Sequence, residues 1–225
     1  QSVHDRLRAI AVDRKEEFNS LLSRYGVERF LYRLIQTRHG KRFVLKGAML
    51  FVLWFDRLHR QTRDLDLLGA GEITEETLRA IFTEVCQIKV HPDGLVFDPA
   101  SITIREIREG QVYQGLRVKV CGKLGNARVE VQIDVGVGDT ITPEPIDVVF
   151  PTLLDLPAPH LKAYPSETVV AEKLDAMVQL GLRNSRMKDF FDIWLLAGNF
   201  HFDGRTLAEA VRRTFERRQT RMEPE

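Results

Sequence analysis

Two aspartates, Asp64 and Asp66, stand one residue apart in the apolar stretch TRDLDLLG. In a β-strand, residues i and i+2 project from the same face, so both carboxylates lie on one side and Leu65 and Leu67 on the other. Two carboxylates that neighbour each other on one strand face repel each other unless a positive charge lies between them. A divalent cation such as Mg²⁺, which takes one or two protein carboxylates and completes its shell with water and phosphate, meets that need. The alternative is a pair of surface aspartates on an edge strand.

A second stretch, ARVEVQIDVGVGD, supplies a third carboxylate, Asp134. The odd-numbered positions from 129 to 137 are apolar, whereas Glu130, Gln132 and Asp134 fall on the other face of the predicted strand. Three carboxylates from two neighbouring strands are typical of sites that transfer phosphoryl groups with two metal ions. A half-exposed strand with a polar outer face fits the same pattern.

Gly47, in LKGAML, is expected to lie where a strand is followed by an apolar helix that ends near Phe55. Helix N-termini bind phosphate through their free N–H groups and the helix dipole. Because the strand–glycine–helix unit directly precedes the strand of Asp64 and Asp66, we interpret Gly47 as a candidate phosphate contact.

Two predicted helices near the C-terminus carry a further charged group. Lys173 falls on the apolar stripe of ETVVAEKLDAMVQLG, and a buried, unpaired ammonium is costly. Lys173 should therefore reach a phosphate or a carboxylate, or extend to solvent. In SRMKDFFDIWLL, Asp189 and Asp192 share one helical face, and Lys188 is spaced for an ion pair with Asp192, the ordinary alternative for this pattern. The buried side of this helix is expected to consist of Phe190, Phe191, Trp194 and Leu195.

The composition is that of a globular protein, with 44% hydrophobic and 29% charged residues. The longest apolar run, AMLFVLWF, has eight residues, whereas a membrane-spanning helix needs about 20. The N-terminal residues contain no apolar block of the kind found in signal peptides. Cys86 and Cys121 have neither metal-binding nor disulfide spacing. Reduced thiols and a cytoplasmic location are therefore expected.

The net charge of +1 gives no overall attraction to nucleic acid, but the charge is unevenly distributed. Between Gly204 and Glu225 there are six arginines against four glutamates. A local basic strip of this kind can bind phosphates. A solvated helix face is the alternative.

Hydrophobic periodicity predicts an α/β (α+β) fold, with a mixed-sheet core, N-terminal helices and a helical C-terminal part. Helices are expected over 3–37 with a break at Gly26, over 74–86 with Thr74 as the N-cap, and over 166–182, 188–198 and 203–217. Strands are expected over 42–46, 64–69, 113–125 and 127–139, and a polar loop over 91–99. Six of the nine prolines fall between Pro143 and Pro165, which predicts an extended connection. The expected divisions are therefore 1–142, 143–165 and 166–225.

Four stretches occur in a recognisable order: FVLKGAML…RQTRDLDLLG, VQIDVGVGD, YPSETVVAEKLDAMVQLGLRNSRMKDFFDIWLL and TFERRQT. Over about residues 7 to 220 the chain resembles the AbiEii/AbiGii-type nucleotidyltransferase toxin family, which belongs to the DNA-polymerase-β-like nucleotidyltransferases and includes the MenT-type toxins. The resemblance implies a toxin of a toxin–antitoxin system. Several members transfer nucleotides from an NTP to the 3′ end of tRNA, which blocks translation. One departure is Ala48, where the family usually has a second glycine or a serine.

The resemblance also implies roles for individual residues. Asp64 and Asp66 match the metal-binding carboxylates, and Lys173 matches the lysine that holds triphosphate. Asp189 matches a late catalytic acid, with Asp192 one helical turn further on. Thr62 matches a hydroxyl that some antitoxins phosphorylate, which would add about two negative charges beside the metal site.

The leading hypothesis is a nucleotidyltransferase that uses Mg²⁺ or Mn²⁺ and acts on an RNA acceptor, which the resemblance implies is tRNA. A cognate antitoxin is the expected partner, and no association with a membrane is expected. Asp134 would be the third metal carboxylate and the general base, and Asp192 would help to orient the nucleotide. The phosphate contacts would come from Lys46, Gly47, Arg63 and Lys173. The RNA contacts would come from Arg212, Arg213, Arg217 and Arg218. The alternatives are a protein or small-molecule acceptor, or a module that binds NTP or antitoxin without catalysis.

Overall fold

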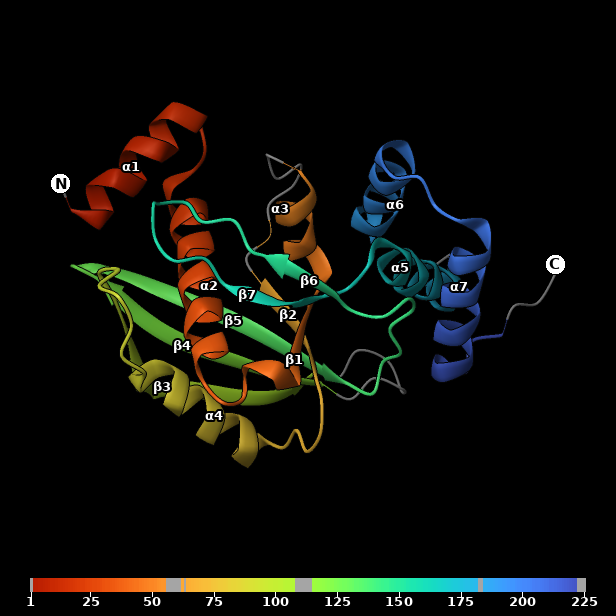
Figure 1. Cartoon of the computed structure of the whole chain (residues 1–225), viewed down its shortest axis with the longest axis horizontal. Helices are drawn as coiled ribbons and strands as arrows, with labels where there is room; N and C mark the ends of the chain where they lie inside the picture. The colour runs from red at the N-terminus through yellow and green to blue at the C-terminus, as the bar shows by residue number, and fades with distance from the viewer. Residues whose placement is uncertain (1, 56–61, 63, 108–114, 182–183, 222–225) are drawn as a thin grey trace. The chain divides into compact units, whose positions relative to one another are not determined.

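The computed structural model describes residues 2–55, 62, 64–107, 115–181 and 184–221 (Figure 1). The chain forms two compact units. Residues 1–137 and 147–162 make up the first, which we call the sheet unit. Residues 138–146 and 163–225 make up the second, the helical unit. The unit boundaries therefore fall at positions other than 143 and 166, because part of the proline-rich segment belongs to each unit.

Two helices open the sheet unit, α1 (Val3–Arg14) and α2 (Phe18–Gln36). The predicted break at Gly26 is wrong, because the helices are separated at residues 15–17. Lys15 ends α1 in a left-handed conformation, and the Glu17 carboxylate caps α2 by accepting from two backbone N–H groups. Gly26 lies inside α2, where an added Cβ would be 2.6 Å from Val129 Cγ1. The glycine thus permits close packing of the helix on the sheet rather than a turn.

The described residues of the sheet unit form a sheet of seven strands in the order β3-β4-β5-β2-β1-β7-β6 (Figure 1). The strand bounds are β1 Phe43–Lys46, β2 Asp64–Gly69, β3 Leu95–Ile107, β4 Gly115–Leu124, β5 Ala127–Val137, β6 Ile146–Val149 and β7 His160–Ala163. Strands β2 and β5 pair in parallel, whereas the pairs β1/β2, β3/β4 and β4/β5 are antiparallel. The four strands predicted from alternation are confirmed as β1, β2, β4 and β5.

Strand β3 was not predicted, since its first residues were assigned to a loop over 91–99. That assignment is wrong from Leu95 onwards. Pro99 falls at a register shift of the β3/β4 pair, between Asp98 and Thr103. A proline is tolerated in a strand at such an irregularity, because its nitrogen has no ladder hydrogen bond to donate. The proline-rich segment likewise contains two short strands, β6 and β7, instead of a plain connection.

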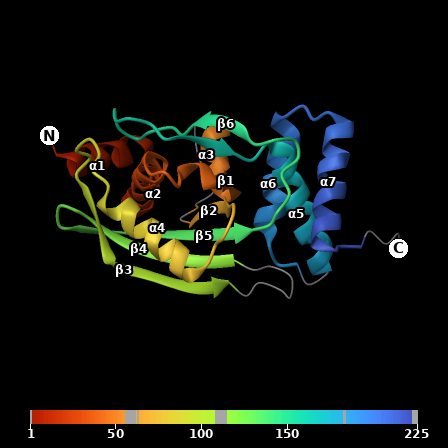
Figure 2. The ribbon, with the colours of Figure 1, turned by 60° about the horizontal axis from the view of Figure 1, so that its bottom comes forward.

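Helices α2 and α4 (Glu75–Gln87) lie on one face of the sheet (Figure 2). The predicted cap of α4 is confirmed, since the Thr74 side chain accepts from the Thr77 N–H. The core beneath these helices contains edge-to-face aromatic pairs, with the Phe30 and Phe82 ring centroids 5.2 Å apart. Fully buried residues from β2 and β5 complete the core: Leu65, Leu67, Val131, Ile133 and Val135. The polar residues of these strands therefore project from the opposite face.

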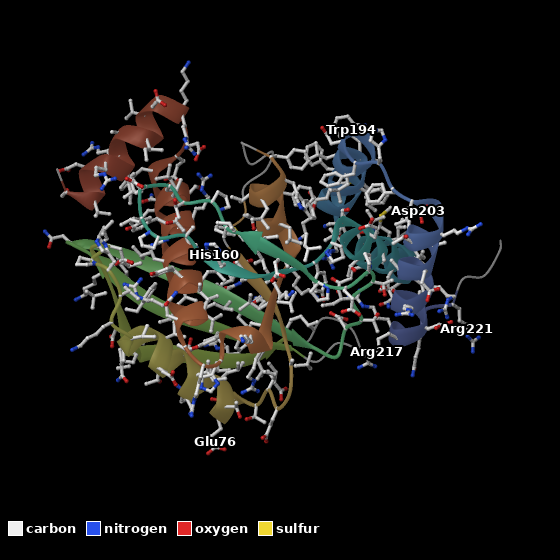
Figure 3. All side chains as sticks on the ribbon, in the orientation of Figure 1. Glu76, His160, Trp194, Asp203, Arg217 and Arg221 are labelled. Atoms are coloured by element: carbon white, nitrogen blue, oxygen red, sulfur yellow. The ribbon has the colours of Figure 1, made fainter. Side chains whose placement is uncertain are left out.

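The helical unit contains α5 (Ser166–Leu180), α6 (Met187–Asn199) and α7 (Gly204–Arg218), close to the predicted bounds. The predicted inner face of α6 is confirmed for Leu195, which is buried, and wrong for its three aromatic residues. Phe190, Phe191 and Trp194 are 41%, 38% and 69% exposed (Trp194 is labelled in Figure 3), whereas Asp189 and Asp192 are buried. The two carboxylates turn inward because they bind a buried lysine, described below. Within the described ranges, no helix combines the length and apolarity needed to span a bilayer.

Candidate functional site

A row of four charged side chains crosses the sheet on the face away from α2. The strand register places Lys46 of β1 opposite Asp66 of β2, Asp66 opposite Asp134 of β5, and Asp134 opposite Arg117 of β4. We call these four residues the charge row. Its signs run plus, minus, minus, plus, so two adjacent carboxylates are flanked by two cations.

Asp64 and Asp66 lie on this face together, as predicted, while Leu65 between them is fully buried. Both aspartates are half-buried, and Asp64 lies opposite Gln132 rather than a charged residue. In the part of the chain that the structure describes, no three His, Cys, Asp or Glu side chains are grouped to hold a metal ion. The pair of aspartates still fits Mg²⁺, since this ion commonly uses one or two protein carboxylates with water and substrate phosphate.

Asp134 forms a bidentate ion pair with Arg117. Arg117 Nε donates to Asp134 Oδ1 at 2.8 Å, and a terminal guanidinium nitrogen donates to Oδ2 at 2.7 Å. Both carboxylate oxygens are thus engaged, in a geometry that is strong for its type. Binding of a metal ion at Asp134 would therefore compete with Arg117 for the carboxylate oxygens. Sequence reasoning did not identify Arg117, because only the β4/β5 register shows that it faces Asp134.

Gly47 has a backbone φ of +71°, which favours glycine. A Cβ at this position would overlap Asp66 Oδ2 and lie 2.6 Å from Asp66 Cγ. The predicted helix after Gly47 is a 3₁₀ turn, Gly47–Met49, followed by the five residues of α3 (Leu50–Trp54). So short a helix has little dipole to attract phosphate. The structural requirement for glycine is therefore its contact with the Asp66 carboxylate.

In the helical unit, Lys173 binds both predicted acids of α6. Its Nζ is 2.9 Å from Asp189 Oδ1 and 2.7 Å from Asp192 Oδ2. Asp189 also forms an ion pair with Arg186, whose Nε is 2.9 Å from Asp189 Oδ2. The Lys173 side chain is 14% exposed and both carboxylates are at most 3% exposed. The expected pairing of Lys188 with Asp192 is wrong, because Lys188 is exposed and Asp192 faces Lys173.

The arginines of α7 do not form one free basic strip. Arg212 binds Glu209 and Glu216, and Arg213 binds Glu209 as well. Hydrogen bonds from these two arginines lower the pKa of Glu209 to about 2. Arg217, which is labelled in Figure 3, donates to a backbone carbonyl of the same unit, that of Gly138.

Arg218 has a different environment from the one predicted for an RNA contact. Its side chain is 10% exposed and lies within 3.2 Å of three carboxylates, those of Asp139, Glu172 and Asp175. The assignment of Arg218 to a surface strip is corrected: buried acids of the helical unit hold it inward. Of the two remaining predicted site residues, Thr62 is half-buried two positions before Asp64, and Arg63 lies outside the described residues.

Comparison with known proteins identifies what the chain is similar to. Residues 29–225 match the family described as nucleotidyl transferase AbiEii toxin, Type IV TA system. The crystal structure of JHP933 from Helicobacter pylori is similar with a TM-score of 0.51 and 17% identity, over 81% of this chain and 68% of that one. A candidate nucleotidyltransferase from H. pylori has a TM-score of 0.50 and 18% identity, over 81% of this chain and 70% of that one. At these identities the structures establish the shared fold alone. Among curated proteins, no sequence matches.

Proposed function

Because the chain belongs to the AbiEii nucleotidyltransferase toxin family, we propose that it transfers nucleotides from an NTP to an RNA acceptor, as the toxin of a toxin–antitoxin pair. The observation that carries this proposal is the pair of half-buried carboxylates, Asp64 and Asp66, on one sheet face with Gly47 packed against Asp66. The acceptor we favour is the 3′ end of tRNA, whose modification would block translation. This choice of acceptor rests on the family.

Asp64 and Asp66 would hold the divalent cation, Mg²⁺ or Mn²⁺. When bound, such an ion bridges phosphate oxygens and makes the attacking hydroxyl more acidic. Lys46, next to Asp66 in the charge row, would neutralise part of the charge on the phosphates. Arg63 would contribute in the same way.

Lys173 would bind the triphosphate, as it does in the family pattern. Asp189 and Asp192 hold its ammonium group at 2.9 Å and 2.7 Å, so the lysine is pre-positioned and loses little side-chain entropy on binding. Lys173→Met should therefore weaken NTP binding as well as transfer. Equilibrium binding of a fluorescent NTP analogue measures this, and unchanged affinity would remove Lys173 from the proposed site.

Asp134 would serve as the third carboxylate and general base once Arg117 releases one of the two carboxylate oxygens of Asp134. Titration with Mn²⁺, followed by electron paramagnetic resonance, tests this without any turnover. If Asp134 joins the metal site, Asp134→Asn should weaken Mn²⁺ binding, and Arg117→Met should strengthen it. If neither variant changes the Mn²⁺ affinity, the metal site is confined to Asp64 and Asp66.

Recognition of RNA would involve the exposed arginines Arg212, Arg213 and Arg217, which would exchange their present partners for phosphates. Each phosphate contact of this kind adds to the salt dependence of binding. The family also implies an antitoxin partner, and Thr62 is our candidate for a residue that the partner modifies.

The direct test is incubation of the protein with total tRNA, Mg²⁺ and each α-labelled NTP in turn, beside Asp64→Ala. We expect label on tRNA with the wild type only, and the labelled NTP identifies the preferred base. Circular dichroism and thermal unfolding of Asp64→Ala serve as the control for folding. Full activity in a folded Asp64→Ala protein would refute the assignment of the metal site.

A second candidate keeps the fold and changes the role. Ala48, in place of the family's usual glycine or serine, lacks a hydroxyl that could contact phosphate. This residue favours an NTP- or antitoxin-binding module. An enzyme with a protein or small-molecule acceptor is the remaining alternative, on which Ala48 has no bearing. NTP binding without pyrophosphate release in the presence of any acceptor would support the binding module. Label on a protein or on an aminoglycoside-type hydroxyl would support the other acceptors.

A further inference from the structure

The sheet unit contains a pocket of about 280 Å³ that none of the proposed site residues lines. Residues of α1, α2, the end of α3 and the segment after β6 surround it; Figures 1 and 2 show α1, α2 and α3 on the same side of β4 and β5. Its lining residues are Arg14, Arg24, Val52, Leu53, Trp54, Phe55, Val149, Pro151, Thr152 and Leu153. The pocket thus combines two arginines with an aromatic and aliphatic wall.

Arg24 is the unusual member of this lining. It is 8% exposed, yet within the described residues its guanidinium donates no hydrogen bond, and its single ion pair, with Glu16, is long at 3.8 Å. A guanidinium has five N–H donors, and no hydrogen bond to the described residues occupies those of Arg24. These donors are therefore available to a ligand in the pocket that Arg24 lines.

The second arginine adds to the positive charge of the pocket. Arg14 is exposed, and among the described residues its side chain forms neither an ion pair nor a hydrogen bond. Burial lowers the pKa of Arg24, and the nearby charge of Arg14 lowers it further, against the opposing charges of Glu16 and Glu28. Two arginines thus line one cavity, and the carboxylates of Glu16 and Glu28 only partly offset the charge of Arg24.

We propose that this pocket binds a phosphate group of a nucleotide, with the guanidinium groups of Arg24 and Arg14 on the phosphate oxygens and the base against Trp54. A guanidinium presents its donors in a planar fork that matches two oxygens of a phosphate. The pocket is larger than a phosphate alone requires, and Trp54 offers a flat apolar surface, which suits a base. The nucleotide is either free or part of an RNA chain.

The pocket does not depend on the proposed transferase chemistry. Its lining includes none of the charge row, and Arg24 comes from α2, which packs on the sheet face opposite to Asp66. Phosphate binding here needs no divalent cation, because the arginines supply the positive charge. Binding can therefore be measured in EDTA, under conditions in which the carboxylate site does not hold a metal-bound nucleotide.

The sequence provides a local probe, because the chain has two tryptophans, Trp54 and Trp194. In a Trp194→Phe background all tryptophan fluorescence comes from Trp54 in the pocket. This protein is titrated in EDTA with inorganic phosphate, adenosine 5′-monophosphate and a short single-stranded RNA. We expect saturable quenching by the monophosphate and a weaker response to phosphate alone. Tighter binding of the RNA identifies a chain as the ligand, and equal binding identifies a free nucleotide.

Three arginine variants in the same background complete the experiment. Arg24→Met and Arg14→Gln should each lower the affinity by about tenfold, because each removes charge-assisted hydrogen bonds. Arg128→Gln, an arginine of β5 outside the pocket, is the matched control and should bind like the parent. Arg14 is exposed, so its variant stays informative if Arg24→Met fails to fold. Quenching that does not saturate, or that persists in Arg14→Gln, would overturn the proposal.

Discussion

At the scale of single residues, the site depends on contacts that tolerate little change. Gly47 is the clearest case, because two independent constraints act on it. Its φ of +71° disfavours any side chain, and a Cβ would enter the space of the Asp66 carboxylate. Phosphate binding through a helix N-terminus would not by itself require that residue 47 lack a Cβ. The close approach of Asp66 does require it.

Gly47→Ala is therefore expected to displace Asp66 and to strain the backbone. The strain should cost about 1–3 kcal/mol of the free energy of unfolding. Mn²⁺ affinity should fall together with stability, because the displaced carboxylate is a proposed ligand. Chemical denaturation and Mn²⁺ titration measure the two effects. Gly125→Ala is the control, since Gly125 also has a positive φ but no atom lies within 4 Å of its Cβ position.

We expect Glu28 to make the free energy of unfolding depend on pH. The residue is fully buried, and its Oε2 accepts from the Leu153 N–H at 2.7 Å. Burial raises the pKa of Glu28 from 4.5 to about 7, and the charge of Arg29 opposes that rise. Between these two values the folded state holds a proton that the unfolded state has released. Stability therefore falls as pH rises from about 4.5 to about 7.

The effect of Glu28 can be isolated with Glu28→Gln, which cannot ionise. The wild-type free energy of unfolding, minus that of the variant, should fall by up to roughly 3 kcal/mol between about pH 5 and pH 8. Urea unfolding at several pH values gives this difference. A difference that stays constant over the range would show that Glu28 titrates as it does in the unfolded chain.

At the scale of elements, the position of α2 on β5 depends on Gly26. A methyl group there would meet Val129 Cγ1 at 2.6 Å and Val131 Cγ2 at 3.0 Å. β-Branched side chains in a strand have little freedom to move away. Helix propensity alone would favour alanine at this position by about 1 kcal/mol, so packing and propensity act in opposite directions.

We expect packing to win in Gly26→Ala, with a net loss of about 1–3 kcal/mol in the free energy of unfolding. Gly198→Ala in α6 is the matched control, because no atom lies within 4 Å of its Cβ position. That variant should be neutral or more stable by up to about 1 kcal/mol. Thermal or urea unfolding of both variants measures the contrast. Stabilisation by both substitutions would show that α2 can shift on the sheet without cost.

At the scale of the whole molecule, each unit contains its own buried ion network. In the sheet unit, Arg33 binds Asp93 through two hydrogen bonds of 2.6 Å and 2.9 Å. In the helical unit, Arg218 holds three carboxylates together. Loss of one partner from a buried ion pair leaves an uncompensated charge, which costs about 3–5 kcal/mol. The two networks can therefore be perturbed separately.

Arg218→Met should destabilise the helical unit by about that amount and leave the proposed metal site of the sheet unit intact. Calorimetry should show a lower unfolding temperature, while Mn²⁺ affinity measured at low temperature stays at the wild-type value. Arg213→Met, in a surface ion pair with Glu209, should change stability by less than about 1 kcal/mol. Equal effects of the two substitutions would show that Arg218 acts as an ordinary surface arginine.

The sequence alone determined what depends on local periodicity. It indicated four of the seven strands of the described sheet, the helices from residue 74 onwards near their observed bounds, the Thr74 cap and the shared face of Asp64 and Asp66. It also indicated that Lys173 would reach a phosphate, a carboxylate or solvent, and the structure pairs it with Asp189 and Asp192. These features follow from the repeat of the strand or helix and from the cost of burying a charge.

Only the tertiary structure decided which side chains meet across elements. The β4/β5 register places Arg117 opposite Asp134. The fold of the helical unit directs Arg218 toward its carboxylate partners. Helix α6 exposes its aromatic rings and buries two acids. Strand β3 could not be predicted across Pro99, because a proline fits within that strand only where the β3/β4 pairing shifts register. A pattern along the chain tells which face a residue occupies. The partner on that face depends on how distant segments pair, which local sequence does not specify.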